Sequence, residues 1–344
     1  MRNTRLRSAA AAVPLLALAV GAPGVASAAG QPSAGQPTAA AWTGATQVVE
    51  RVPAPQATLV AGPRSTRTTL VAAPAQGRSG SASATTQGGA TFTVTYSGFT
   101  PAARAAFQRA VDIWAGALQS SVPVTVKASF EPLGSGVLGS AGASSIYKNF
   151  TGAPQRDTWY VDAIANKHAG RQLDSSPDIV ARFNSGFDNW HYGTSAAPRG
   201  TYDFTSVVLH ELGHGLGFLG AGQVSSGVGT VRTSGLPIAY DRFTENGAGK
   251  ALLSFADRSS ALKTQLTGGS VFFDSQAVRS ANGSRPARLY APSTWDQGSS
   301  YSHLAEAAYP AGNKNSLMTP RFSDGETVRY PGPITKAIFR TIGW

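Results

Sequence analysis

The stretch VVLHELGHGLGFLG, residues 207–220, decides how the rest of the chain is interpreted. His210 and His214 lie four residues apart, so on a helix their imidazoles project from one face and can reach the same metal ion. Glu211 points about 100° further round the helix, where it can hold a water beside the ion. The pattern predicts a zinc-hydrolase helix in which Glu211 takes a proton from a zinc-bound water.

The surroundings of the two histidines favour such a metal site. The chain has only five histidines, and two of them are in this motif. The flanking positions are apolar on both sides, so the pair is expected to be buried, and burying imidazoles and a carboxylate without a partner is costly. A surface helix with exposed histidines, or a purely structural zinc site, remains the alternative. The apolar flanking residues are Val207, Val208, Leu212 and Leu216.

A third metal ligand must come from outside this helix. Gly217 is expected to end the helix and turn the chain. Three residues later, where an extended form of the motif has a histidine, the chain has Gly220. An acidic ligand on a following helix would need a second long amphipathic helix, and none is visible between 219 and 300. Asp241 and Glu245 are the nearest acids that could take this role.

Three histidines remain as candidates for the third ligand. His168 and His191 lie in polar or Gly-rich sequence, which predicts exposed loops. His303 lies in SSYSHL, a short distance before NSLMTP. In NSLMTP, Met318 is followed by Thr319 and Pro320, a sequence typical of a tight turn. A methionine in a turn beneath the zinc, following the third histidine, marks one protease clan. This pattern favours His303 as the third metal ligand.

The motifs HELGHGLGF, GSSYSHL and NSLMTP, with a long insert between the first two, together resemble the leishmanolysin-like metzincins and their bacterial relatives. Those proteins are zinc endopeptidases in which an insertion after the glycine displaces the third histidine. The resemblance implies that Zn²⁺ is the cofactor and that protein or peptide chains are the substrates. The implied roles are zinc ligand for His210, His214 and His303, catalytic base for Glu211, turn residue for Gly217 and Met-turn residue for Met318.

The resemblance covers residues 87–344 in outline and implies an α+β fold. This fold is a metzincin-like catalytic domain with a mixed twisted sheet, an active-site helix and zinc at the cleft, followed by an irregular C-terminal subdomain ending in a helix. His303 lies 86 residues after Gly217, which predicts that 218–302 form a small insert subdomain. The cysteines that leishmanolysin uses for disulfides and latency are absent.

The first 28 residues read as a secretory signal peptide. Arginines precede a 12-residue apolar run, and Ala26-Ser27-Ala28 follow as a cleavage site. The run is shorter than the ~20 residues that a membrane helix needs, so we expect a secreted, extracellular monomer without membrane insertion. With no cysteine in the chain, a hydrophobic core or a bound metal must supply the stability.

The charge distribution argues against nucleic-acid binding. The formal net charge is +11, but seven of the 29 Lys and Arg residues precede residue 87, where Glu50 is the single acid. The remainder carries +5 and has no basic block, which is typical of a mildly basic secreted domain.

Residues 29–86 are rich in small and polar residues and predict a low-complexity pro-segment or linker, so the protein would be made as a zymogen. Only QVVERV (47–52) and TLVAA (69–73) are expected to form local structure. A pro-segment that blocks zinc through a side chain would have to use Glu50, because this segment has no Cys, His or Asp. Alternatively, the segment is a folding aid or a wall-spanning linker.

Periodicity predicts the regular elements of the remainder. Alternation predicts strands near 92–96 and 122–130, and between them Thr100 caps a helix that begins at Pro101. DTWYVDAI (157–164) and DIVARFN (178–184) are expected to be strands, the second being either the edge strand that pairs with substrate or an interior strand. The terminal GPITKAIFRTIGW predicts a helix. The helix after Pro101 has an apolar stripe of Phe107, Ala110, Val111, Trp114 and Leu118.

The leading hypothesis is a secreted zinc endopeptidase. One alternative is a non-catalytic cell-wall or adhesion protein on a metzincin scaffold, against which the intact Glu211 argues, since a binding protein needs no base beside the zinc. The other is a zinc peptidase with an acidic third ligand such as Asp241.

Overall fold

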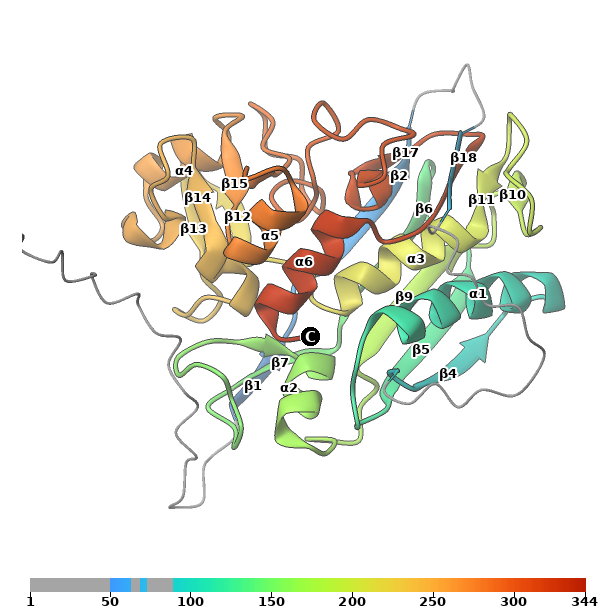
Figure 1. Cartoon of the computed structure of the whole chain (residues 1–344), viewed down its shortest axis with the longest axis horizontal. Helices are drawn as coiled ribbons and strands as arrows, with labels where there is room; N and C mark the ends of the chain where they lie inside the picture. Colours follow the sequence, from blue (N-terminus) through green and yellow to red (C-terminus); the bar gives the residue numbers. More distant parts are fainter. Residues whose placement is uncertain (1–49, 63–68, 73–88) are drawn as a thin grey trace, which may run out of the picture. The chain divides into compact units, whose positions relative to one another are not determined.

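A six-stranded mixed sheet organises the residues that the computed structural model describes, which are 50–62, 69–72 and 89–344 (Figure 1). Its strand order is β17-β2-β6-β9-β5-β4. Strands β4, β5 and β9 are parallel, β6 is antiparallel to β9, and β2 is antiparallel to β6 and parallel to β17. The bounds are Phe92–Ser97 for β4, Val124–Glu131 for β5, Ile179–Asn184 for β9, Val137–Ala143 for β6, Ala57–Ala61 for β2 and Arg321–Phe322 for β17.

Helix α1 (Pro101–Ala117) confirms the expected element between the first two strands of the domain. The Thr100 side chain accepts a hydrogen bond from the N–H of Ala103 at 3.2 Å, and Pro101 occupies the first turn, where its missing N–H costs nothing. The predicted apolar stripe is buried against the sheet and the next long helix. The preceding strand β4 alternates half-buried and exposed residues, as its sequence predicts.

Helix α3 (Phe204–Gly215) carries the HELGH motif and is buried along its whole length. It lies beside α1 and packs on β6 and β9 (Figure 1). Asp203 caps it by accepting from the N–H of Ser206 at 2.8 Å. The helix ends two residues before Gly217, whose φ of 114° is open to glycine and strained for other residues. The predicted end of this helix is confirmed.

The insert, 218–302, has more regular structure than expected. It contains a β-hairpin, a three-stranded sheet and two short helices. It belongs to the same compact unit as all other described residues. Its longest helix has seven residues, so the expected lack of a long helix in the insert is confirmed. The elements are β12 (Gly222–Ser225), β13 (Val228–Val231), η1 (Ala239–Phe243), β14 (Thr244–Asn246), η2 (Leu252–Ser254), α4 (Ser260–Leu266), β15 (Val271–Phe273), α5 (Gln276–Ala281) and β16 (Ala287–Arg288).

Smaller elements complete the fold. The predicted C-terminal helix is confirmed as α6 (Pro333–Ile342), and Ile334, Ile338 and Ile342 are its buried face. No helix in the described part of the chain is long and apolar enough to cross a membrane. The other elements are β1 (Glu50–Pro53), β3 (Thr69–Ala72), β7 (Ser145–Lys148), β8 (Tyr160–Val161), α2 (Asp162–Ala169), β10 (Trp190–His191), β11 (Tyr202–Asp203), η3 (Ser316–Met318) and β18 (Glu326–Arg329).

The structure tests three expectations about strands. DTWYVDAI was expected to be one strand, but only Tyr160–Val161 is extended and α2 begins at Asp162. DIVARFN forms β9 as predicted, and its place between β5 and β6 confirms the interior alternative over the edge strand. Within the low-complexity segment, β1 and β3 fall in the two stretches expected to form structure, whereas β2 was not predicted. The proposed signal peptide, 1–28, lies outside the described residues.

Asp162 predicts a pH dependence of stability. Burial raises the pKa of this carboxyl to about 8, although the N–H of Ser145, which donates to it at 2.7 Å, acts in the opposite direction. The folded chain therefore binds more protons than the unfolded chain between pH ~4 and ~8, and its stability falls as pH rises through this range. Asp162→Asn stays neutral and can still accept the bond, so we expect its free energy of unfolding to rise relative to the native chain between pH 4 and 8.

Urea unfolding of both proteins at several pH values measures this difference. Asp112→Asn, on the exposed face of α1, is the control and should show a nearly constant difference. A constant difference for Asp162→Asn as well would contradict the assignment.

Candidate metal and catalytic site

Three histidines from distant parts of the chain meet in the interior. His210 and His214 come from α3, and His303 comes from the segment that follows the insert. All three are fully buried. The Nε2 atoms lie 3.0 Å apart for His210 and His214, 3.1 Å for His214 and His303, and 3.2 Å for His210 and His303. The structure thus brings together the three residues expected to bind zinc, and in the described part of the chain they are the one group that could hold a metal ion.

The hydrogen bonds of these rings fix their protonation. Each Nδ1 faces a backbone carbonyl, which can only accept, so each Nδ1 carries the ring proton and each Nε2 carries a lone pair. Three lone pairs directed at one another repel unless a cation lies between them. The pairs are His210 with Leu317 at 2.6 Å, His214 with Phe218 at 2.8 Å and His303 with Ser299 at 2.7 Å.

The geometry and the charge state both fit a metal ion. Two nitrogens at ~2.0–2.1 Å from a tetrahedral zinc lie about 3.3 Å apart, close to the observed separations. Burial lowers the pKa of His214 to about 4, and burial together with the neighbouring histidines lowers the pKa of His210 and His303 well below the usual value. The three rings are therefore neutral at pH 7, the form in which imidazole binds zinc.

Glu211 is a buried carboxylate without a hydrogen-bond partner of normal geometry at either oxygen. Burial raises its pKa well above the usual value, and the nearby backbone N–H groups of Leu59 and Ala141 oppose this rise. Orphaned polar atoms of this kind are rare in folded proteins and mark a place where a water, ion or reacting group binds. Glu211 thus follows His210 on α3 as a fully buried carboxyl whose oxygens have no hydrogen bond of normal geometry.

Position 220, three residues after Gly217, has no space for a histidine side chain. A Cβ atom there would lie 2.2 Å from the ring of Tyr301 and 2.6 Å from Oδ1 of Asp241. The N–H of Gly220 donates to the Ser302 hydroxyl at 3.2 Å. The last residues of the insert therefore pack directly on its first residues. This contact positions His303, which follows Tyr301 by two residues, next to His210 and His214.

Asp241 holds this contact together and is not placed as a metal ligand. Its carboxylate accepts from the hydroxyl of Tyr301 at 2.8 Å, from the N–H of Ile238 at 2.8 Å and from the N–H of Ala221 at 3.0 Å. Tyr301 is buried with φ at 72°, a left-handed conformation that costs about 1 kcal/mol or more and persists only where the surroundings impose it. Sequence reasoning assigned no role to Tyr301 and offered Asp241 only as an alternative ligand.

Met318 lies where the turn after His303 meets the motif helix. A Cβ on Gly213, between the two histidines of α3, would come within 2.8 Å of the Met318 sulfur. The Met318 carbonyl accepts a hydrogen bond at 2.7 Å from the N–H of Leu304, the residue after His303. The carbonyl of Leu317 accepts a hydrogen bond from Nδ1 of His210. One short turn therefore contacts the residues around two of the three histidines.

The other two histidines are not in exposed loops, contrary to expectation. His168 is half-buried in the last turn of α2, with Nε2 3.0 Å from the carbonyl of Gly343. His191 is half-buried in β10, with Nε2 3.1 Å from the carbonyl of Ser195. Both contacts are structural.

Glu50, the one side chain of 29–86 that could block zinc directly, does not lie at the histidine group. Its carboxylate is about half exposed and pairs with Nζ of Lys148 on β7 at 2.9 Å, whereas the three histidines are fully buried. The residue of this segment that approaches the site is Leu59, in β2, which sequence reasoning missed.

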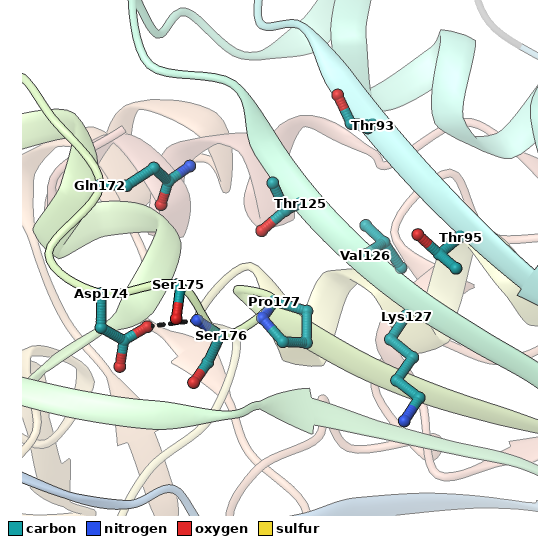
Figure 2. Close-up of a pocket in the computed structure, with 10 residues that line it drawn as sticks. All are labelled: Thr93, Thr95, Thr125, Val126, Lys127, Gln172, Asp174, Ser175, Ser176 and Pro177. Carbon is teal, nitrogen blue, oxygen red and sulfur yellow. Dashed lines mark hydrogen bonds between the residues drawn. The ribbon is translucent and has the colours of Figure 1, made fainter.

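A pocket of about 330 Å³ on β4 and β5 is a weaker candidate site (Figure 2). Its carboxylate, Asp174, accepts from the Tyr147 hydroxyl at 2.6 Å and the Ser176 N–H at 2.7 Å and pairs with Arg51, so it is engaged in structural contacts. The lining residues are Thr93, Thr95, Thr125, Val126, Lys127, Gln172, Asp174, Ser175, Ser176 and Pro177.

Comparisons with protein-family models, curated proteins and solved structures found no match. The chemistry of the site therefore rests on its own geometry and on the sequence motifs.

Gly220→Ala is expected to disturb the site. The added methyl group collides with Tyr301, and relieving such overpacking typically costs about 1–3 kcal/mol of unfolding free energy. Because Tyr301 positions His303, we also expect weaker zinc retention on dialysis. Gly116→Ala is the matched control, since nothing lies within 4 Å of its Cβ and alanine favours a helix. Equal behaviour of the two variants in urea unfolding and zinc analysis would contradict this role.

Proposed function

We propose that the protein is a secreted zinc-dependent endopeptidase of the metzincin type. The observation that carries the proposal is the convergence of three Nε2 lone pairs on one buried point, at a helix that also carries the buried Glu211, whose oxygens have no hydrogen bond of normal geometry. Three neutral nitrogen ligands with a fourth position free are typical of catalytic zinc. Support for the metzincin type comes from the HELGHGLG motif, the delayed third histidine and Met318 in the turn below α3.

In this proposal His210, His214 and His303 hold the zinc ion. When bound, zinc lowers the pKa of a coordinated water towards ~7 and polarises the carbonyl of the substrate. Glu211 orients the attacking water, accepts its proton and delivers that proton to the amine nitrogen that leaves.

Export and activation from a precursor belong to the same proposal. The sequence of 1–28 supports a signal peptide, and the composition of 29–86 supports a segment that is removed or displaced. The competing function is a non-catalytic binding protein. Such a protein would not need a buried glutamate whose oxygens have no hydrogen bond of normal geometry.

Substitutions at the site separate catalysis from metal binding. Glu211→Gln is expected to retain zinc and to lose casein or gelatin hydrolysis by about 10²–10⁴-fold, because proton transfer is removed. His303→Ala is expected to lose both zinc and hydrolysis. Zinc content and hydrolysis of the exported protein are the measurements, with His168→Ala as a control that should change neither.

Asp241→Ala tests the acidic alternative ligand. It should lower stability and, like Gly220→Ala, weaken zinc retention through the loss of its contact with Tyr301, while the fraction that folds still binds zinc when the ion is supplied in excess. Zinc retained in His303→Ala and lost in folded Asp241→Ala would overturn the ligand assignment. Hydrolysis unchanged in Glu211→Gln would overturn the proposed function.

A further inference from the structure

The C-terminal ends of α1, α2, α3 and α6 lie together beside a cavity of about 350 Å³ (Figure 1). The Nε1 of Trp344, just after α6, donates to the carbonyl of Leu216, the residue that follows α3, at 2.7 Å. The carbonyl of Gly343 accepts from Nζ of Lys167, in the last turn of α2, at 2.7 Å. Ala117, the last residue of α1, lines the cavity. None of the lining residues is a proposed zinc ligand.

Three cations and no acid line this cavity. Lys167 comes from α2, and Lys336 and Arg340 come from α6. In the part of the chain that the structure describes, no carboxylate forms an ion pair with any of the three. Positive charges that share one cavity repel one another, so an anion placed between them would lower their electrostatic free energy.

Helix dipoles explain only part of this arrangement. Lys167 and Arg340 lie in the last turns of α2 and α6, where a cation offsets the partial negative charge of a helix C-terminus. Lys336 is the fourth residue of α6, near the positively polarised end, where a cation is unfavourable. Its ammonium lies 4.8 Å from the centre of the Tyr330 ring, a contact that does not neutralise the charge. The charge of Lys336 therefore needs another explanation.

Burial gives the cavity a second reason to bind an anion. Lys167 is half-buried, and burial lowers the pKa of its ammonium because the charged form loses hydration. Besides its bond to Gly343, the ammonium lies 5.6 Å from the centre of the Trp344 ring. Both contacts leave the net charge in place. A bound anion would compensate for the lost hydration.

Aromatic rings form the apolar part of the cavity. Phe339 is fully buried, and its ring packs edge to face on Trp114 with the ring centres 5.0 Å apart. Trp344 is half-buried, and its bond to the Leu216 carbonyl holds the indole in place. Rings that are held before binding lose little freedom when a ligand arrives, and their surfaces suit a flat apolar group.

We propose that this cavity binds a small organic anion, in which one carboxylate or phosphate group is attached to a single flat ring. The Arg340 guanidinium can hold such a group through two parallel hydrogen bonds, and Lys167 and Lys336 add charge. The ring lies against Phe339 and Trp344. The cavity is at the small end of the ~300–1,000 Å³ range of ligand sites, which fits one ring.

Isothermal titration calorimetry of the full chain with benzoate and with phenyl phosphate tests the site. We expect one or both to bind about 10-fold or more tightly than inorganic phosphate, which lacks the ring, and than benzyl alcohol, which lacks the charge. The tighter of the two ring anions identifies the preferred oxyanion. Its affinity should fall when NaCl is raised from about 50 to about 500 mM, because salt screens the cations.

Charge-matched variants locate the binding. Lys336→Gln/Arg340→Gln removes two of the cations and should weaken binding of the ring anion by about 10-fold or more. Lys263→Gln/Arg285→Gln removes the same charge from exposed positions in the insert and should bind as the native chain does. Arg340→Gln alone, at an exposed position, should weaken binding by about 3-fold or more and carries the test if the double variant does not fold.

Three outcomes would overturn the inference. The first is that neither ring anion binds. The second is that inorganic phosphate binds as tightly as the ring anions, since the aromatic rings then contribute nothing. The third is an affinity that is unchanged in the α6 variants, because the anion then binds elsewhere, including at a metal held by the histidines. Hydrolysis is not measured, so the proposed function stands or falls separately.

Discussion

The mutual approach of three unprotonated ring nitrogens is the constraint on which the rest of the structure depends. Each lone pair is fixed by a carbonyl on the opposite side of its ring, and these carbonyls belong to three segments: the turn after α3, the end of the insert, and the turn of Met318. All three segments must be in place before the nitrogens can converge. A cation at this point would relieve the repulsion, so its binding energy would add directly to the stability of the folded state.

The insert satisfies this constraint because its two ends meet. Position 220 has no space for a side chain, since Tyr301 and Asp241 fill it. The buried Asp241 carboxylate accepts hydrogen bonds from the Tyr301 hydroxyl and from two backbone N–H groups. These bonds hold the first and last residues of 218–302 together. The length and internal structure of the insert can therefore vary without moving His303, because its position depends on the contact at the base.

Local elements could be predicted from the sequence, and non-local pairing could not. Helices α1, α3 and α6 carry their own signals: α1 and α3 begin with a side-chain cap, α1 and α6 have a proline in the first turn, and α3 and α6 are followed by a glycine. The histidine site could be predicted because its residue types are rare in this chain. The interior position of β9 depends on which strands pair with it, and the helix beginning at Asp162 depends on the bond from Ser145. Strand β2 has a readable signal, since Ala57 and Leu59 alternate with half-buried residues, but low complexity on both sides concealed it.

The contacts that hold the N-terminal strands β1 and β2 differ in strength. Strand β1 is attached by ion pairs of Glu50 with Lys148 and of Arg51 with Asp174, each partly exposed and worth about 0–1 kcal/mol. Full burial of a leucine side chain contributes about 1.5–3 kcal/mol. Salt weakens the ion pairs but has little effect on the burial of Leu59. Strand β2 is therefore held by its main-chain pairing with β6 and β17 and by buried apolar side chains, chiefly that of Leu59, whereas β1 depends on exposed ion pairs.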